Sequence, residues 1–272
     1  MSQKWALVSG GSTGIGYEIC KLFAHDGVNL VIPALPTDDL DRAANFFRSH
    51  YGVEVIMIPA DLILETEPKR IFDLLSDKGI KIDFLVNNAG FGMYGDFLKT
   101  QLDREAGMVK LNCVSLMSMT ALFLEQAVRE GRHLKIMNLA STAAFQPGPY
   151  MAVYFATKAF VFSFSLGLRL EIEDLGYDVT VTALCPGPTM SRVTSSTGSH
   201  FWDALDVKSS WLFTLLKPTT PQEVALAGYK AMMKGKRMVV PGWRHKIVAW
   251  FSRIDTTGIS GKVVRFLQRQ HK

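Results

Sequence analysis

The stretch that decides the fold is SGGSTGIG at residues 9–16, which joins a short apolar run at 4–9 to a segment of helical length at 14–26. Its glycines at 10, 14 and 16 allow a tight turn and a close approach of the backbone to a ligand, while the first NH groups of the helix point at a pyrophosphate. The stretch therefore predicts a dinucleotide-binding loop, although a purely structural turn is the alternative. The candidate ligand contacts are Gly10, Ser12, Thr13, Gly14, Ile15 and Gly16.

Outward from this loop, short apolar runs alternate with segments of helical length. The runs are rich in Val, Ile and Leu, as strands buried on both faces are. The pattern predicts an α/β fold, a Rossmann-like doubly wound parallel sheet of about seven strands with helices on both faces, whose ligand lies beyond the carboxyl ends of the strands. The runs lie at 4–9, 28–33, 53–58, 82–86, 134–140, 178–184 and 237–240, and the helical segments include 14–26, 65–78, 101–130 and 152–174.

The composition, with 48% hydrophobic and 20% charged residues, is that of a folded globular protein and excludes disordered and collagen-like chains. The three cysteines lie far apart without a CxxC pair, which argues against a disulfide framework and fits a reducing compartment. The six histidines have no metal-ligand spacing, so we expect no catalytic metal. We recognise neither a signal peptide nor a spanning segment, and expect a cytoplasmic protein.

The net charge of +5 is unevenly distributed along the chain. Residues 1–229 carry a net charge of −5 and residues 230–272 one of +10, and no module that reads nucleic acid is visible. We divide the chain into a domain at 1–240 and a basic amphipathic helical extension at 241–272. The apolar stripe of this extension either packs on the domain or attaches reversibly to an anionic membrane surface. The stripe and the charges around it include Arg244, Lys246, Ile247, Trp250, Phe251, Arg253 and Ile254.

Two further signals follow the third and fourth apolar runs. Asp61 and Leu62 lie where a carboxylate can accept a hydrogen bond from an adenine amino group. Asn88, Ala89 and Gly90 are small enough to let the backbone approach a ribose. Each signal alone is more typical of a helix cap or a turn, but their order at successive strand ends supports the dinucleotide site.

The catalytic signal is the pair Tyr154 and Lys158, with Ser141 13 residues upstream of the tyrosine at the end of an apolar run. A spacing of four on a helix projects both side chains from one face, so they can share a pocket. Such pairs are usually ordinary surface pairs. The upstream loop and Ser141 favour the catalytic interpretation here.

Over residues 4–240 the sequence resembles the short-chain dehydrogenase/reductase superfamily. The family's glycine pattern is present, with Ser9 where Thr is usual, and its Asn-Asn-Ala-Gly stretch is intact at 87–90. Asn112 looks like the family's helix asparagine, and the catalytic set is Asn112, Ser141, Tyr154 and Lys158. The turn on the nicotinamide side looks like Pro186, Gly187 and Thr189.

The chemistry of ketone reduction agrees with this resemblance. Hydride transfer leaves negative charge on oxygen, so the site needs a proton donor and a second hydrogen-bonding group. Tyr154 and Ser141 supply them, and the ammonium of Lys158 is expected to lower the tyrosine's pKa. The resemblance implies that Lys158 also bonds the nicotinamide ribose and that Asn112 holds a water linking Lys158 to solvent.

The cofactor is predicted to be NADP, with NAD as the alternative. Ala34 stands where NAD-preferring members commonly place an acid, while Leu35 and Thr13 stand where NADP-preferring members often place a base. Arg42 is a remote candidate for the 2′-phosphate. Asp38 and Asp39 keep NAD open.

The predicted activity is that of a carbonyl reductase or alcohol dehydrogenase acting on a hydrophobic ketone or secondary alcohol. A 3-oxoacyl thioester reductase is the first alternative, and a dinucleotide-binding sensor without catalysis is the second. Residues 190–217 are the expected substrate lid, whose aromatic and aliphatic side chains either line the site or pack the lid onto the body. We also expect a homo-oligomer.

Overall fold

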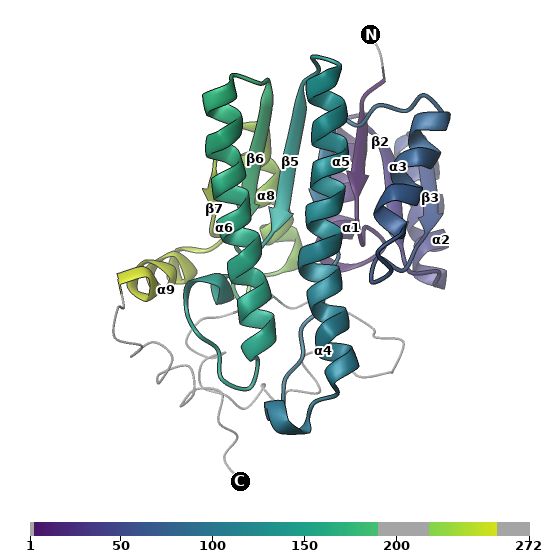
Figure 1. Ribbon diagram of the computed structural model, residues 1–272. Coiled ribbons are helices and arrows are strands. Elements are labelled where there is room, and N and C mark those ends of the chain that lie inside the picture. The colour runs from purple at the N-terminus through teal and green to yellow at the C-terminus, as the bar shows by residue number, and fades with distance from the viewer. Residues whose placement is uncertain (1–2, 190–217, 255–272) are drawn as a thin grey trace.

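The computed structural model describes residues 3–189 and 218–254, and the predicted lid at 190–217 lies outside them (Figure 1). In the described part of the chain, seven strands form one parallel sheet in the order β3-β2-β1-β4-β5-β6-β7. Each predicted apolar run overlaps one of them, with strand ends that differ by at most two residues, so the predicted sheet is confirmed. The strands are β1 (Trp5–Val8), β2 (Asn29–Ala34), β3 (Val55–Pro59), β4 (Phe84–Asn87), β5 (Leu134–Leu139), β6 (Val179–Leu184) and β7 (Met238–Val239).

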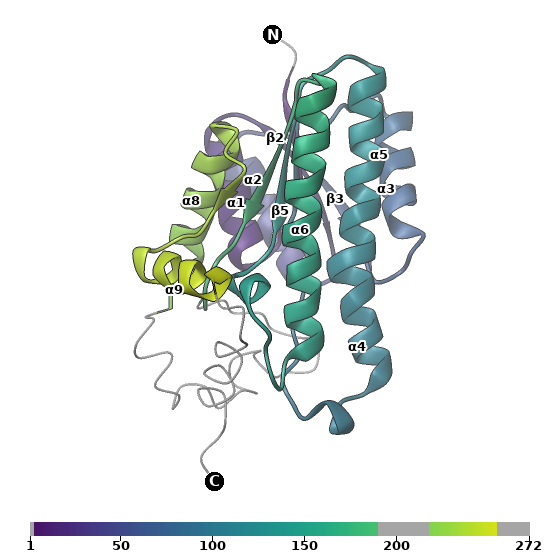
Figure 2. The same cartoon turned by 60° about the vertical axis from the view of Figure 1, so that its left-hand side comes forward.

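Helices cover both faces of the sheet, as predicted (Figures 1 and 2). One layer contains α1 (Gly14–His25), α2 (Asp38–Tyr51) and α8 (Pro221–Met233). The other layer contains α3 (Glu67–Asp77), α5 (Leu116–Arg129) and α6 (Ala152–Leu175). The helix α4 (Leu102–Val109) lies in line with α5, beyond the ends of the strands (Figure 1). At the carboxyl ends of the strands lie α9 (Trp243–Ile254) and two short 3-10 turns, η1 (Phe97–Lys99) and η3 (Thr142–Phe145).

The predicted helical segment at 101–130 contains three pieces. A π-helical turn, η2 (Lys110–Ser115), separates α4 from α5 and contains Asn112. Such a turn inserts an extra residue into the helix and is frequent at functional sites. Hydrophobic periodicity does not detect it, because the residues on either side keep a helical pattern.

Most of the core lies in two apolar layers, and a group of buried polar side chains joins β4 and β5 to α5 and α6. All residues of β1, β2 and β4 are buried, as expected for strands covered on both faces. Asn87 on β4 donates to Asn138 on β5 and to Thr120 on α5, each at 2.9 Å. Asn138 in turn donates to Ser165 on α6 at 3.0 Å. These four buried residues form a buried amide network, in which every amide nitrogen has an acceptor.

The strand order places β1 beside β4, so the segments that follow these strands lie side by side. The Ser9 hydroxyl accepts hydrogen bonds from the backbone NH groups of Asn88 and Ala89, each at 3.0 Å. The Asn88 amide donates to the Ser9 carbonyl at 2.9 Å. These bonds hold the glycine loop against the Asn88–Gly90 turn, at the point where a doubly wound sheet binds its ligand.

Two helical stretches, Leu102–Arg129 and Ala152–Leu175, are long and apolar enough to cross a membrane by length and composition. Core helices of globular proteins commonly share these properties, and both stretches pack against the sheet here. Their length is therefore weak evidence for a membrane span.

Candidate active site

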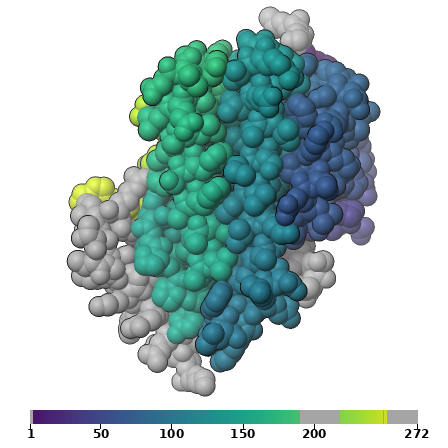
Figure 3. All heavy atoms as spheres, viewed as in Figure 1, coloured from purple at the N-terminus to yellow at the C-terminus, as the bar shows by residue number. Residues whose placement is uncertain are grey.

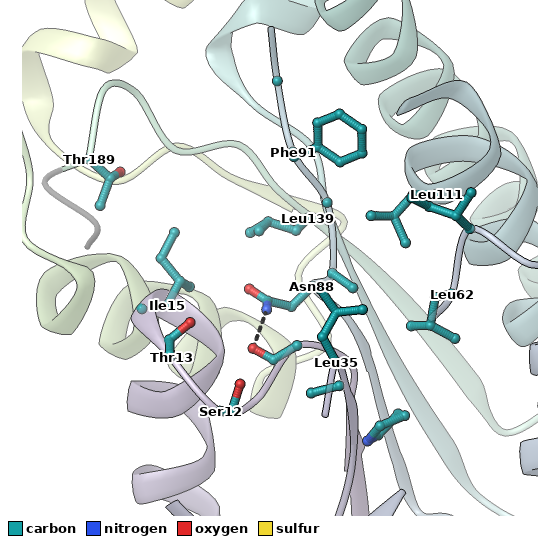
Figure 4. Close-up of a pocket in the computed structure, with 18 of the residues that line it drawn as sticks. Ser12, Thr13, Ile15, Leu35, Leu62, Asn88, Phe91, Leu111, Leu139 and Thr189 are labelled. Atoms are coloured by element: carbon teal, nitrogen blue, oxygen red, sulfur yellow. Dashed lines mark hydrogen bonds between the residues drawn. The ribbon is translucent and has the colours of Figure 1, made fainter. Parts of the chain in front are cut away.

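A cavity of about 390 Å³ opens at the carboxyl ends of the strands (Figure 4). Its volume falls within the range of small-molecule sites. Sixteen of the eighteen predicted site residues line it, and Gly16 and Asn112 do not. The sixteen are Gly10, Ser12, Thr13, Gly14, Ile15, Asp61, Leu62, Asn88, Ala89, Gly90, Ser141, Tyr154, Lys158, Pro186, Gly187 and Thr189.

The glycine loop has the backbone conformation that its sequence predicts. Gly10 and Gly14 have φ values of +63° and +58°, which residues with side chains rarely adopt. Gly16 has another role, because a Cβ there would lie 2.4 Å from the Gly10 carbonyl oxygen. Its missing side chain lets α1 pack against the loop, so Gly16 shapes the cavity from behind.

Asp61 lies in the cavity wall beyond β3. Its Oδ1 accepts a hydrogen bond from the Ile63 backbone NH at 3.1 Å, which fixes the carboxylate beside the turn. The residue therefore makes a local turn contact and also faces the cavity. From the sequence alone, these two roles are alternatives.

Lys158 is buried at the base of the cavity, with 4% of its surface exposed. Its Nζ donates to the Leu139 carbonyl at 2.9 Å and lies 5.7 Å from the centre of the Tyr154 ring. Burial disfavours the charged ammonium and lowers the pKa of Lys158 to about 8. A proton on this side chain is therefore exchangeable near neutral pH.

Burial also raises the pKa of the Tyr154 phenol, and a hydrogen bond with the Ser141 hydroxyl opposes this shift. The direction is opposite to the lowering that we expected from Lys158. In the protein without a ligand, loss of water raises the free energy of the phenolate by more than the nearby groups lower it.

Ser141 connects the catalytic side of the cavity to the Pro186–Thr189 turn. Its hydroxyl accepts from the Ala143 NH at 3.1 Å and donates to the Pro186 carbonyl at 3.3 Å. The Thr142 NH donates to the same carbonyl at 2.9 Å. The position of the turn is thus coupled to that of the serine.

Asn112 lies behind the cavity wall, with 1% of its surface exposed. Its side chain accepts from the Phe91 NH at 3.2 Å, and donates to the Phe91 carbonyl at 2.9 Å and to the Thr157 hydroxyl at 3.1 Å. It joins η2 to the segment after β4 and to α6. A side chain on Gly90 would collide with it, since a Cβ there would lie 2.8 Å from Asn112 Oδ1.

At the other end of the cavity, β2 presents no charged side chain. Ala34 and Leu35 line the wall, and the acids that line the cavity are Asp39 on α2 and Asp61 beyond β3. Arg42 forms an ion pair with Asp39. Arg42, the remote candidate for contact with the 2′-phosphate, is therefore paired with Asp39, one of the two acids that leave NAD as the alternative cofactor.

Sequence reasoning missed several residues of the site. Ser9 was noted only as a departure from the family pattern, yet its hydroxyl joins two loops. Phe91, Leu111 and Leu139 line the cavity (Figure 4), but ordinary apolar residues carry no motif that would single them out. Among the described residues, no group of three or more His, Cys, Asp or Glu side chains is arranged to hold a metal ion.

Comparison with known proteins gives consistent matches. Residues 4–201 match the family described as short chain dehydrogenase. A very-long-chain 3-oxoacyl-CoA reductase of Anas platyrhynchos is 33% identical over 178 residues, covering 63% of this chain and 56% of that protein. The protein of the same name from Mus musculus is 28% identical over 260 residues, covering 92% and 80%. This chain thus spans little more than half the length of the first relative.

Among solved structures, a short-chain dehydrogenase from Sphingobium yanoikuyae in complex with NADPH superimposes with a TM-score of 0.77. The two chains are 26% identical, and the match covers 99% of this chain and 97% of the other. The likeness extends over the whole sheet and its helices.

Proposed function

Because the chain belongs to the short-chain dehydrogenase family, we propose that it is an oxidoreductase that transfers hydride between NADP(H) and a hydrophobic ketone or secondary alcohol. The observation that carries the proposal is that Tyr154, Lys158 and Ser141 line the same cavity as the glycine loop. Family membership confirms the resemblance inferred from the motifs.

The cavity fits a dinucleotide. Gly10 and Gly14 hold the loop in a conformation that brings backbone NH groups and the start of α1 to the cavity, which suits a pyrophosphate. A Cβ on Gly10 would lie 3.2 Å from the Asn88 side chain, so the cradle depends on small residues. When bound, the nicotinamide supplies or accepts the hydride.

The chain's own residues manage the charge on the substrate oxygen. We assign Tyr154 as the group that gives its phenolic proton to this oxygen during reduction. Ser141 is the second hydrogen-bond donor to it, once its hydroxyl hydrogen turns from the Pro186 carbonyl to the substrate oxygen. Lys158 holds a proton beside them, with its pKa lowered by burial to about 8. Asn112 acts through others, because it positions Phe91 and the helix that carries Tyr154 and Lys158.

NADP is the proposed cofactor, with NAD as the alternative. The absence of an acid at Ala34 and the neutralisation of Asp39 by Arg42 both reduce repulsion of a 2′-phosphate. Ala34→Asp is expected to restore that repulsion and to shift the ratio of kcat/KM values towards NADH, while Leu35→Asn introduces no charge and serves as the control. Unchanged NADPH kinetics in Ala34→Asp would contradict this assignment.

A 3-oxoacyl thioester is the second candidate substrate. It is favoured by relatives named as very-long-chain 3-oxoacyl-CoA reductases, and the net charge of +10 on residues 230–272 suits the phosphates of coenzyme A. The sensor alternative is disfavoured, because binding alone does not require Ser141, Tyr154 and Lys158 to line one cavity.

The test is a substrate panel with purified protein, using NADPH and NADH in parallel. It contains short and long 3-oxoacyl thioesters, steroids and aryl ketones, and each reaction is followed by loss of the reduced cofactor. We expect turnover with an apolar carbonyl compound, and a preference for long 3-oxoacyl chains would select the second candidate. Tight cofactor binding without any turnover would support the sensor instead.

For location, we propose a cytoplasmic protein with peripheral contact to an anionic membrane through α9. Trp243, Ile247 and Trp250 are 67%, 47% and 59% exposed, and they recur on one face of the helix. The interpretation of 241–272 as an extension beyond a domain at 1–240 stays a prediction, and residues 255–272 lie outside the described part.

Flotation with anionic and neutral vesicles at low salt tests this contact. We expect binding to anionic vesicles only, and its loss when Trp243 and Trp250 are both replaced by alanine. Replacement of Leu226, an exposed leucine on α8, is the control. Binding that survives the double tryptophan replacement would exclude α9 as the contact.

A further inference from the structure

One buried side chain beyond the matched residues 4–201 lies against the proposed nicotinamide side of the cavity. His245, on α9, is 2% exposed. A Cβ built on Gly187 would lie 2.4 Å from Cδ2 and 2.7 Å from Nε2 of its ring. The imidazole thus occupies the space that Gly187 leaves by having no side chain.

The ring is held in place from the opposite side as well. Its Nδ1 lies 3.2 Å from the Pro241 carbonyl, within hydrogen-bond distance. Gly242, with φ of +80°, passes so close that a Cβ would lie 2.9 Å from Nδ1. Nε2 is buried without a hydrogen-bond partner among the described residues. The His245 ring therefore makes only van der Waals contact with Gly187, and the hydrogen bond with the Pro241 carbonyl orients the ring.

The Pro186–Thr189 turn is fixed by its other neighbours too. Ser141 and Thr142 donate to the Pro186 carbonyl. On the far side, the Thr219 NH donates to the Pro188 carbonyl at 3.0 Å. His245 supplies the third support, because its ring fills the space beside Gly187.

The helix α9 contacts the segment after Ser141 as well as the Pro186–Thr189 turn. It packs against η3, the short turn that starts after Ser141 (Figure 2). Ala249 joins a buried cluster with Ala140 and Cys185. His245 and Ala249 are four residues apart and lie on the buried face of α9, opposite to the exposed tryptophans. The helix α9 therefore stabilises both the segment after Ser141 and the Pro186–Thr189 turn.

We propose that His245 is a positioning residue for the nicotinamide half of the cofactor, acting through Gly187 and the Pro186–Thr189 turn. This inference rests on the proposed function. It makes α9 part of the cofactor site, although α9 lies outside the residues that match the family.

The test compares binding of the whole cofactor with binding of its adenosine half. Wild type, His245→Ala and the control Lys246→Ala are titrated with NADPH and with 2′,5′-ADP, or with NADH and ADP if NAD is the cofactor. Lys246 is an exposed neighbour on the same helix. We expect His245→Ala to weaken binding of the whole cofactor about tenfold or more, because a turn that is no longer held in place must be ordered when the cofactor binds. Binding of the adenosine half should not change.

A double substitution gives a second readout that a general loss of stability would not produce. Gly187→Ala should weaken cofactor binding, because its methyl group collides with the ring. Adding His245→Ala removes the obstacle, so the double variant should bind better than Gly187→Ala alone. His245→Asn keeps a donor for Pro241 but lacks the ring, and it carries the same comparison if His245→Ala does not fold.

The outcomes separate the two proposals. Wild type that binds neither the cofactor nor its adenosine half would overturn both the proposed function and this inference. Wild type that binds both, with a His245 variant that binds the whole cofactor equally well, would overturn the inference alone. Equal weakening of both ligands, or a double variant no better than Gly187→Ala, would also overturn it.

Discussion

Lys158 is buried and Tyr154 is half-buried beside it, and their removal from water shifts both side chains towards their uncharged forms. A phenol and an ammonium that are both poorly solvated gain from any group that brings charge or hydrogen bonds into the cavity. We therefore expect the pKa values of Tyr154 and Lys158 to change when a ligand binds in the cavity.

The first prediction concerns the proton donor. Tyr154→Phe removes the phenolic hydroxyl and keeps the ring, so the rate of reduction should fall by at least about 100-fold, as expected for loss of a general acid. Cofactor affinity, measured by calorimetric titration, should stay close to that of wild type. Turnover near the wild-type rate would show that another group protonates the substrate.

The second prediction concerns the stability cost of Lys158. Its folded-state pKa of about 8 lies below the ordinary value of 10.5, so at pH 7 the folded protein pays for a buried charge that the unfolded chain does not bury. This cost, of order 3 kcal/mol, is relieved as the pH rises from 8 towards 10.5. Lys158→Met should abolish turnover yet raise the free energy of unfolding at pH 7 relative to wild type.

Urea unfolding at pH 7 and pH 10 measures this difference, with Lys78→Met at an exposed position as the control. The stability advantage of Lys158→Met should shrink at pH 10. An advantage that grew with pH, or none at pH 7, would contradict the sign of the shift.

At the scale of helices, strands and loops, the same glycine-to-alanine substitution is expected to have opposite effects on stability at two positions, Gly16 and Gly167. Gly16→Ala would place a methyl group 2.4 Å from a backbone oxygen, which cannot move aside as a side chain can. Gly167, in the interior of α6, has open space where its Cβ would be.

The third prediction follows from this contrast. Gly16→Ala should destabilise the protein by about 1–3 kcal/mol through overpacking and weaken cofactor binding. Gly167→Ala should stabilise it by about 0.5–1 kcal/mol, because alanine favours a helix interior. Thermal or urea unfolding of both variants checks the signs, and a destabilised Gly167→Ala would show that this position of α6 is covered in solution.

The strands could be predicted from the sequence because runs of Val, Ile and Leu of strand length are typical of a parallel sheet buried on both faces. Tyr154 and Lys158 could be predicted because a helical spacing of four brings them together. The pKa direction of Tyr154 could not be predicted, since it depends on how deeply the fold buries the ring. His245 could not be found either, because it belongs to no motif and meets Gly187 only when α9 folds back.

For the whole molecule, the outer face of α5 and α6 suggests a contact surface. The two helices lie side by side across one face (Figure 3). Met117, Phe160 and Leu170 are 41%, 40% and 50% exposed on them. Exposed apolar side chains along two neighbouring helices are typical of association surfaces, and a second copy of this chain is the occupant that we propose.

The fourth prediction tests this surface. Wild type should have the mass of an oligomer by light scattering, and replacing Phe160 and Leu170 with glutamate should lower that mass by placing charges in an apolar interface. Leu226→Glu, on α8 in the opposite layer, should not change it. A monomeric wild type, or a double variant that keeps its mass, would exclude this surface.

The buried amide network has a consequence for how the chain avoids misfolding. Asn87 and Asn138 face each other in the register of β4 and β5. If those strands slipped by one residue, a carboxamide would turn to the other face of the sheet and lose its partner, at a cost of about 1–3 kcal/mol. The network therefore favours the native register of β4 and β5 over a register shifted by one residue. A chain with leucine at both positions should refold into a mixture of species, detectable as heterogeneous amide exchange.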